Sequence, residues 1–196
     1  MERAMAMSAQ EALERLKSGN AEYVKASANT GDISQERIKQ LSEEGQAPYA
    51  CIVSCADSRV VPEHIFMAGL GELFTIRVAG NLIGDMELGS CLYAAEHLGV
   101  KLIVLLGHTQ CGAVASALEA LATGAKLEGA MEPLLAGMFA SIGGERDPRA
   151  ASVANARRGA SMIMENGEIA HLVQSEGLKV VPALYHTETG VVEFME

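Results

Sequence analysis

The stretch that decides the fold is YACIVSCADSR, residues 49–59. It opens with a continuous apolar run, which is typical of a strand buried on both faces of a parallel sheet. It closes with reactive side chains at alternate positions, Cys55, Asp57 and Arg59. Side chains two residues apart in an extended chain point to the same side. We therefore expect a thiol, a carboxylate and a guanidinium to converge at the end of a buried strand.

Apolar runs of the same kind recur along the chain and alternate with helical patterns. Strands are predicted at 49–54, 73–79, 101–107 and 178–185, and a hairpin at 188–190 leads into an antiparallel edge strand at 191–194. Helices are predicted at 9–25, 34–44, 62–68, 85–98, 111–123, 131–141 and 149–175, the last with a break near Asn166. The pattern predicts an α/β fold with a mostly parallel central sheet, an antiparallel edge strand and flanking helices.

The composition indicates a globular protein with a sizeable core. The 196 residues are 49% hydrophobic, and we interpret 1–196 as one domain with an N-terminal helical arm (1–45) and an α/β core (46–196). A net charge of −10 argues against binding nucleic acid or anionic membranes. The sequence has neither an apolar run of about 20 residues nor the apolar core of a signal peptide, so we expect a cytoplasmic protein.

A second reactive pair follows the third predicted strand, which ends at Gly107. His108 and Cys111 lie three apart in a turn that enters a helix. The carboxyl ends of parallel strands share one edge of a sheet, so Cys55 joins this pair if the two strands are neighbours. Two thiolates and one imidazole suit Zn²⁺ and leave its fourth position open. The HxxC pair alone could also have no metal-binding role, because a cysteine at a strand end is often only a small buried side chain that packs in the core.

Disulfides are the other interpretation of four cysteines. A chain of this length and apolarity needs no such cross-links. Cys51 and Cys55 would face the same side of one strand but lie about 13 Å apart, too far for a bond. The cysteines therefore favour a metal site over a disulfide framework.

The alternating triplet gives the carboxylate and the guanidinium separate roles beside a metal. Asp57 is placed to accept a hydrogen bond from a reacting water, and Arg59 is placed to grip Asp57 and keep it ionised. If Arg59 released Asp57, the carboxylate could bind the metal at its open position and block the site.

Taken together, CADSR at 55–59 and HTQCG at 108–112 resemble the β-class carbonic anhydrases. The likeness covers most of the chain and continues through IRVAGN (76–81), SCLYA (90–94), NARR (155–158) and the segment 180–190. The resemblance implies one Zn²⁺ per subunit held by Cys55, His108 and Cys111. It also implies that Asp57 and Arg59 form the catalytic dyad. The reaction would be the reversible hydration of CO₂ to bicarbonate and a proton, by attack of zinc-bound hydroxide.

The resemblance also implies a substrate pocket, a subtype and an assembly. The pocket residues would be Gln46, Phe74, Ala79, Tyr93 and Gly112, with the small Ala79 leaving more room than a larger aliphatic. The closed subtype has Trp at the position of Ile52, so the open, plant-like subtype is favoured. The partners would be CO₂ or bicarbonate and further copies of the chain, as a homodimer or a dimer of dimers whose N-terminal helices extend onto the partner.

Two other functions remain open at this point. Carbonyl sulfide and carbon disulfide hydrolases resemble the same family and share its zinc site. A zinc-stabilised interaction domain without activity is the non-enzymatic alternative. The Asp57–Arg59 pair and Gln46 argue against it, since a structural zinc site needs neither.

Overall fold

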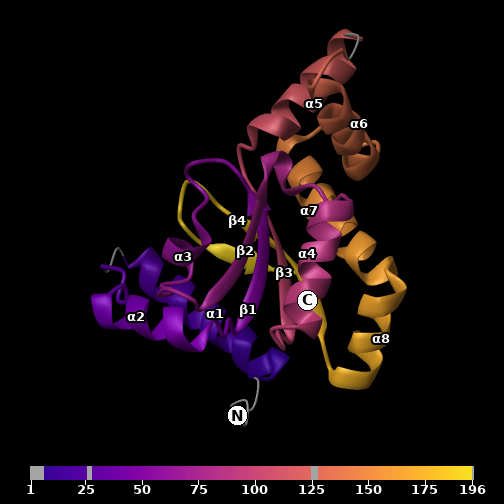
Figure 1. The fold of residues 1–196 in the computed structure, drawn as a ribbon. Helices are drawn as coiled ribbons and strands as arrows, with labels where there is room; N and C mark the ends of the chain where they lie inside the picture. Colours follow the sequence, from indigo (N-terminus) through magenta and orange to yellow (C-terminus); the bar gives the residue numbers. More distant parts are fainter. Residues whose placement is uncertain (1–6, 26–27, 125–127, 196) are drawn as a thin grey trace.

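The structure is a computed structural model that describes residues 7–25, 28–124 and 128–195 (Figure 1). Its strands are β1 (Ala50–Cys55), β2 (Leu73–Val78), β3 (Leu102–His108), β4 (Lys179–Tyr185) and β5 (Val192–Phe194). Its α-helices are α1 (Ala9–Val24), α2 (Gln35–Glu44), α3 (Pro62–Ile65), α4 (Asp85–Glu96), α5 (Gly112–Thr123), α6 (Met131–Ile142), α7 (Pro148–Glu165) and α8 (Gly167–Glu176). A short 3₁₀ helix, η1 (Ala79–Asn81), follows β2.

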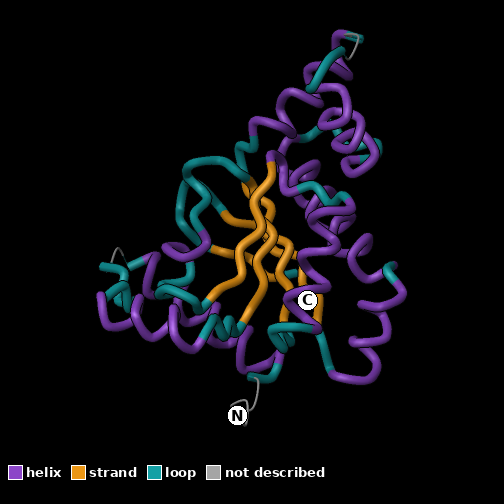
Figure 2. Tube along the Cα trace, viewed as in Figure 1, coloured by secondary structure: helices purple, strands orange, loops and turns teal. Residues whose placement is uncertain are grey.

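The strands lie together as one sheet (Figure 2). Their order in the sheet is β2-β1-β3-β4-β5. β1 pairs in parallel with both β2 and β3, and β3 pairs in parallel with β4. β5 joins β4 in the antiparallel direction as an edge strand. The predicted α/β architecture is therefore confirmed, and the first and third predicted strands are neighbours.

Both faces of the sheet are buried, which explains the continuous apolar runs. On one face Ile52 and Val104 pack in a cluster with residues of α1 and α3. On the other face Val53 and Leu105 pack with residues of α4, α7 and α8. A third cluster lies at the carboxyl end of the central strands, where α5 and α6 extend beyond the sheet (Figure 1). This cluster contains Cys55 and Cys111.

The two N-terminal helices contact their own chain to different extents. α1 packs on its own sheet, because its apolar stripe of Ala12, Leu13 and Leu16 is buried in the same cluster as Ile52. Buried Asn20 fastens the end of this helix to the β4–β5 turn through the turn's backbone. α2 buries no residue, and its Ile38 is 45% exposed.

Most element boundaries lie within two residues of those predicted, and one helix is corrected. The helix predicted at 62–68 ends at Ile65, where Met67 adopts a positive φ of 51°. The break predicted near Asn166 in the last helix is confirmed, because Asn166 leaves the helical region between α7 and α8 and its side chain caps α8. Within the described ranges, the molecule has no helix that is long and apolar enough to span a bilayer.

Candidate metal centre

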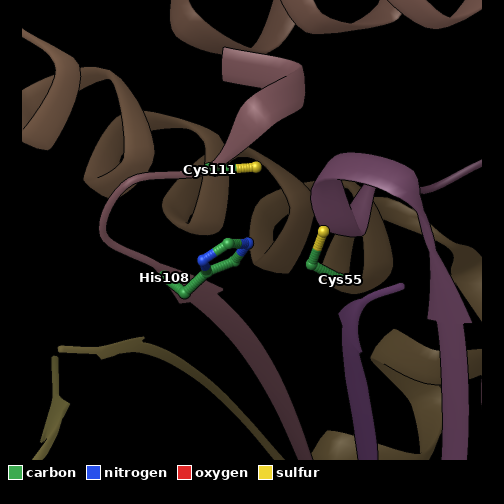
Figure 3. A group of neighbouring side chains, drawn as sticks. All are labelled: Cys55, His108 and Cys111. Carbon is green, nitrogen blue, oxygen red and sulfur yellow. The ribbon is translucent and has the colours of Figure 1, made fainter. Parts of the chain in front are cut away.

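The three predicted ligands come together at the carboxyl ends of two neighbouring strands. Cys55 ends β1, His108 ends β3, and Cys111 begins the turn into α5. One ligand atom from each of the three lies within 4.8 Å of the other two, and all three residues are buried. The two sulfur atoms and the imidazole ring turn toward one common space (Figure 3). This spacing suits a single ion between them.

The imidazole presents a free lone pair to that space. Nδ1 of His108 lies 2.9 Å from the carbonyl oxygen of Thr109, and a carbonyl can only accept, so Nδ1 carries the hydrogen. Nε2 is then the unprotonated nitrogen, and it is buried without a hydrogen-bond partner among the described residues. A buried acceptor of this kind costs free energy unless a hydrogen-bond donor or a cation binds its lone pair. Such a tautomer is the one that a metal-binding histidine needs.

The two thiols shift each other's pKa in opposite directions. A hydrogen bond from the Cys111 thiol is the largest effect on Cys55 and lowers the pKa of that thiol, although burial opposes it. The same bond raises the pKa of Cys111, and burial adds to that rise. Cys55 is thus the sulfur that ionises first. A thiolate beside an imidazole lone pair favours a borderline-soft cation such as Zn²⁺.

Backbone groups hold Cys55 from two sides. Its sulfur accepts hydrogen bonds from the N–H of Asp57 at 3.4 Å and the N–H of Gly80 at 3.2 Å. Arg77 on β2 donates to the carbonyl oxygens of Cys55 at 3.2 Å and Asp57 at 2.8 Å. Sequence reasoning did not assign this role to Arg77, although a charged residue inside an otherwise apolar strand is a visible signal.

The Asp57–Arg59 pair forms as predicted. Oδ1 of Asp57 accepts from the backbone N–H of Arg59 at 2.9 Å and from Nε at 3.0 Å, while Oδ2 accepts from Nη2 at 2.8 Å. The hydrogen bonds from the Arg59 guanidinium hold the pKa of the Asp57 carboxyl far below its usual range. The carboxylate is therefore ionised at neutral pH, and its side chain is only 17% exposed.

Gln110 is a second partner of Arg59 that the sequence pattern did not reveal. It lies in the turn between His108 and Cys111 with a positive φ of 57°. Its carbonyl oxygen accepts from Nη2 of Arg59 at 3.1 Å, and its side-chain oxygen accepts from Nη1 at 3.4 Å. The loop that carries two metal ligands therefore also anchors the guanidinium.

The predicted substrate residues fall into two groups. Ala79 precedes Gly80, whose N–H touches the Cys55 sulfur, and Gly112 follows Cys111 directly, so both lie at the candidate centre. The second group is Gln46, Phe74 and Tyr93. Phe74 pairs with Cys51 in the sheet register, and Cys51 lies four residues before Cys55 on β1.

The second group lies at the opposite end of the sheet. Tyr93 stacks near Phe74 with ring centroids 6.1 Å apart, and Gln46 is exposed in the segment before β1. Gln46 lines a cavity of about 720 Å³ with residues at the amino ends of the strands, Tyr49 and Lys101 among them. Within one chain, Gln46, Phe74 and Tyr93 are therefore separated from the metal ligands by the length of the strands.

The fold and the site together define an α/β protein with a candidate mononuclear metal centre of two thiolates and one imidazole at the edge of a parallel sheet. Residues 50–192 match the protein-family model for carbonic anhydrase. The chain belongs to the carbonic anhydrase family, and its similarity to solved structures is to the β class.

Named relatives agree with this assignment. Carbonic anhydrase 2 of Mycobacterium tuberculosis is 46% identical over 109 residues, which are 56% of this chain and 52% of that protein. The chain thus matches about half the length of this curated relative. A tetrameric β-carbonic anhydrase of Sordaria macrospora has a TM-score of 0.71 at 25% identity, covering 81% of this chain and 85% of that one. A β-carbonic anhydrase of Aspergillus fumigatus has a TM-score of 0.69 at 28% identity, covering 83% of each chain.

Proposed function

We propose that this chain is a zinc-dependent carbonic anhydrase of the open subtype, which hydrates CO₂ reversibly to bicarbonate and a proton. The observation that carries the proposal is the convergence of Cys55, His108 and Cys111 beside the Asp57–Arg59 pair. A purely structural zinc site would have four protein ligands and no need for an ionised carboxylate next to it. The described residues supply three ligands and that carboxylate.

Zn²⁺ fits this donor set. Cys55, His108 and Cys111 would hold it, and the free Nε2 lone pair of His108 points into the space between the sulfurs. When bound, Zn²⁺ supplies a Lewis acid that lowers the pKa of water and so provides a nucleophile near neutral pH. The position not taken by these residues would remain for the reacting water.

Asp57 orients the reacting water in this proposal. Its oxygens accept from Arg59, and each carboxylate oxygen has further lone-pair capacity with which to accept a hydrogen bond from the water. Because Arg59 keeps the carboxylate ionised, Asp57 accepts that bond and does not compete as a donor. Arg59 holds both carboxylate oxygens of Asp57 and is itself anchored by Gln110, which supports the open subtype. The aliphatic Ile52 is buried in the sheet, where the closed subtype would have Trp.

A second copy of the chain completes the substrate pocket. Gln46, Phe74 and Tyr93 cannot reach the metal ligands of their own chain, so we propose that they serve the site of a partner, in a homodimer or a dimer of dimers. The outer edge of β2 has no strand partner in the described part of the chain. Tyr93 is 47% exposed and Met86 on the same helix is 80% exposed, which supports burial of this face by a partner.

In the assembled pocket each residue would have a separate task. Gln46 would donate its amide N–H to an oxygen of CO₂ or bicarbonate. Phe74, Tyr93 and Ala79 would form a small dry wall, and Gly112 would let the backbone approach the substrate. A dry pocket strengthens the hydrogen bonds made inside it, which matters as charge develops on the CO₂ oxygens.

Metal analysis and a CO₂ hydration assay on the same preparation test this proposal. We expect about one zinc per chain and hydration that disappears when zinc is removed by a chelator and returns when zinc is restored. Turnover of carbonyl sulfide is measured in parallel. Zinc-loaded protein that turns over carbonyl sulfide but not CO₂ would identify the hydrolase alternative. Zinc-loaded protein that turns over neither substrate would leave the non-enzymatic domain.

A further inference from the structure

We propose that Asn155 is a positioning residue for the metal ligand Cys55 and acts through the backbone of Gly80. This inference rests on the proposed metal site. Asn155 lies on α7, far from Cys55 in sequence, and touches neither the metal ligands nor the Asp57–Arg59 pair in any recorded hydrogen bond. Its effect would be carried by two hydrogen bonds in series.

The first bond fixes the sulfur. Of the two N–H groups that donate to Cys55, that of Asp57 belongs to the same loop and follows from local geometry. That of Gly80 comes from a segment 25 residues away, at 3.2 Å, and is buried. This second donor lies just beyond the β1–β2 ladder, whose last pair is Cys55 and Val78, so its direction depends on the backbone of η1. Hydrogen bonds to a ligating sulfur tune its charge and orientation.

The η1 backbone has an unusual conformation at this point. Gly80 has φ 70° and ψ 17°, and Asn81 follows with φ 45°, so two successive residues occupy the left-handed region. A side chain at Gly80 would begin 2.5 Å from Cε of Met138 and 3.0 Å from Cβ of Ala113. Packing thus closes one side of this turn, but packing contacts do not select the direction of a peptide N–H.

The second bond holds the adjoining peptide, because the carbonyl of Gly80 belongs to the Gly80–Asn81 peptide and is related to the Gly80 N–H through the φ and ψ of Gly80. Nδ2 of Asn155 donates to the carbonyl oxygen of Gly80 at 2.8 Å in a buried setting. A carbonyl only accepts, so the amide nitrogen must be the atom that faces it. Asn155 is 2% exposed, among buried apolar neighbours on the same helix face such as Ala151 and Ala156. Burying an amide there is costly unless its hydrogen bonds are made, which points to a specific use.

A zinc competition titration with a matched pair of variants tests the inference. Asn155→Ala removes the donor to Gly80. Ser152→Ala is the control, because Ser152 is equally buried on α7 but its hydroxyl donates to Pro148 within the helix, at 2.9 Å. We expect the dissociation constant for Zn²⁺ to rise about tenfold in Asn155→Ala, the lower end of what outer-shell changes cause. We expect it to change less than about twofold in Ser152→Ala.

A spectroscopic measurement separates positioning from general destabilisation. The protein is loaded with a spin-half cadmium isotope, and couplings from cadmium to backbone amide protons are observed across N–H···S hydrogen bonds. The wild type should show couplings at both Gly80 and Asp57. Asn155→Ala should lose the coupling at Gly80 and keep that at Asp57, while Ser152→Ala should keep both.

The outcomes are distinct. A wild type that binds cadmium without coupling at Gly80 would overturn the inference even if Asn155→Ala failed to fold. So would an Asn155→Ala protein with unchanged zinc affinity and an intact Gly80 coupling, or equal losses of affinity in the two variants. A wild type that binds neither zinc nor cadmium would instead overturn the proposed function, and this inference with it.

Discussion

Two variants that each have low activity alone should form a mixed dimer with one intact site, because the proposed pocket is divided between two chains. The variants are Asp57→Ala, which removes the carboxylate beside the metal, and Gln46→Ala, which removes the proposed substrate donor. Each should lower CO₂ hydration about 100-fold, the usual loss for an acid–base group or a transition-state hydrogen-bond donor. Neither substitution touches a metal ligand.

The expected recovery of hydration activity follows from the distance between the two halves of the pocket in one chain, which the sheet register gives. Phe74 lies opposite Cys51 and Val78 lies opposite Cys55, so Phe74 is about 13 Å along the strand from the ligand level. Gln46 precedes β1 at the same end. In a mixed two-fold dimer, one site therefore carries both substitutions and the other carries neither. Random mixing gives half mixed dimers with half of their sites intact, about a quarter of wild-type activity.

The assay is stopped-flow CO₂ hydration on the two variants refolded together in equal amounts. A pull-down through a tag on one variant confirms that mixed assemblies have formed. Asp57→Ala mixed with Arg59→Ala is the control, since both changes fall on the same half of the pocket and no intact site can form. If mixed assemblies form and their activity stays at the level of the single variants, Gln46 does not serve the partner's site.

Three further predictions use other parts of the structure. Cys111→Ala should lose zinc on dialysis, whereas Asp57→Ala should keep about one zinc per chain; elemental analysis checks both, and metal-free Asp57→Ala would contradict the ligand assignment. Asn20→Ala should lower the free energy of unfolding by about 2–3 kcal/mol, because it leaves buried backbone groups of the β4–β5 turn unpaired; a loss below about 0.5 kcal/mol in denaturant titration would refute this. Burial raises the pKa of Tyr49 to about 12. The neutral phenol is therefore favoured, and the stability that it contributes is complete below about pH 10 and is lost as the pH approaches 12. Tyr49→Phe should then lack a phenolate absorbance transition near pH 12, and an unchanged titration would contradict the assignment.

The sheet could be predicted from the sequence because its strands are buried on both faces. Runs such as Leu102–His108 are apolar without alternation, and this pattern marks a parallel strand between two layers of helices. The ligands could be predicted for a related reason. Once Cys55 and His108 are each placed at a strand end, a parallel sheet brings them to one edge. Only the order of the strands was missing, since periodicity does not say which strands are neighbours.

The supporting residues could not be predicted, because they depend on backbone conformations that the pattern does not encode. Gln110 binds Arg59 through a carbonyl that a positive φ turns toward the guanidinium, and nothing in the residue type requires that φ. Asn155 looks like an ordinary polar residue of a helix until the η1 turn is in place beside it. The sequence pattern did not place α1 for a similar reason. An amphipathic helix shows that it packs, but not on which surface.

The supporting contacts also make the two halves of the pocket depend on one strand. β2 carries Arg77, which donates to the backbone carbonyl of Cys55, and it carries Phe74 three residues earlier along the same strand. We propose that Phe74 serves the partner's site. β2 is the edge strand of the sheet, against which the partner would pack. Displacement of this edge strand would therefore move Arg77 as well as Phe74. It follows that assembly of the dimer and the geometry of the metal ligands should be coupled through β2, so that separating the copies weakens the metal site as well as dividing the pocket.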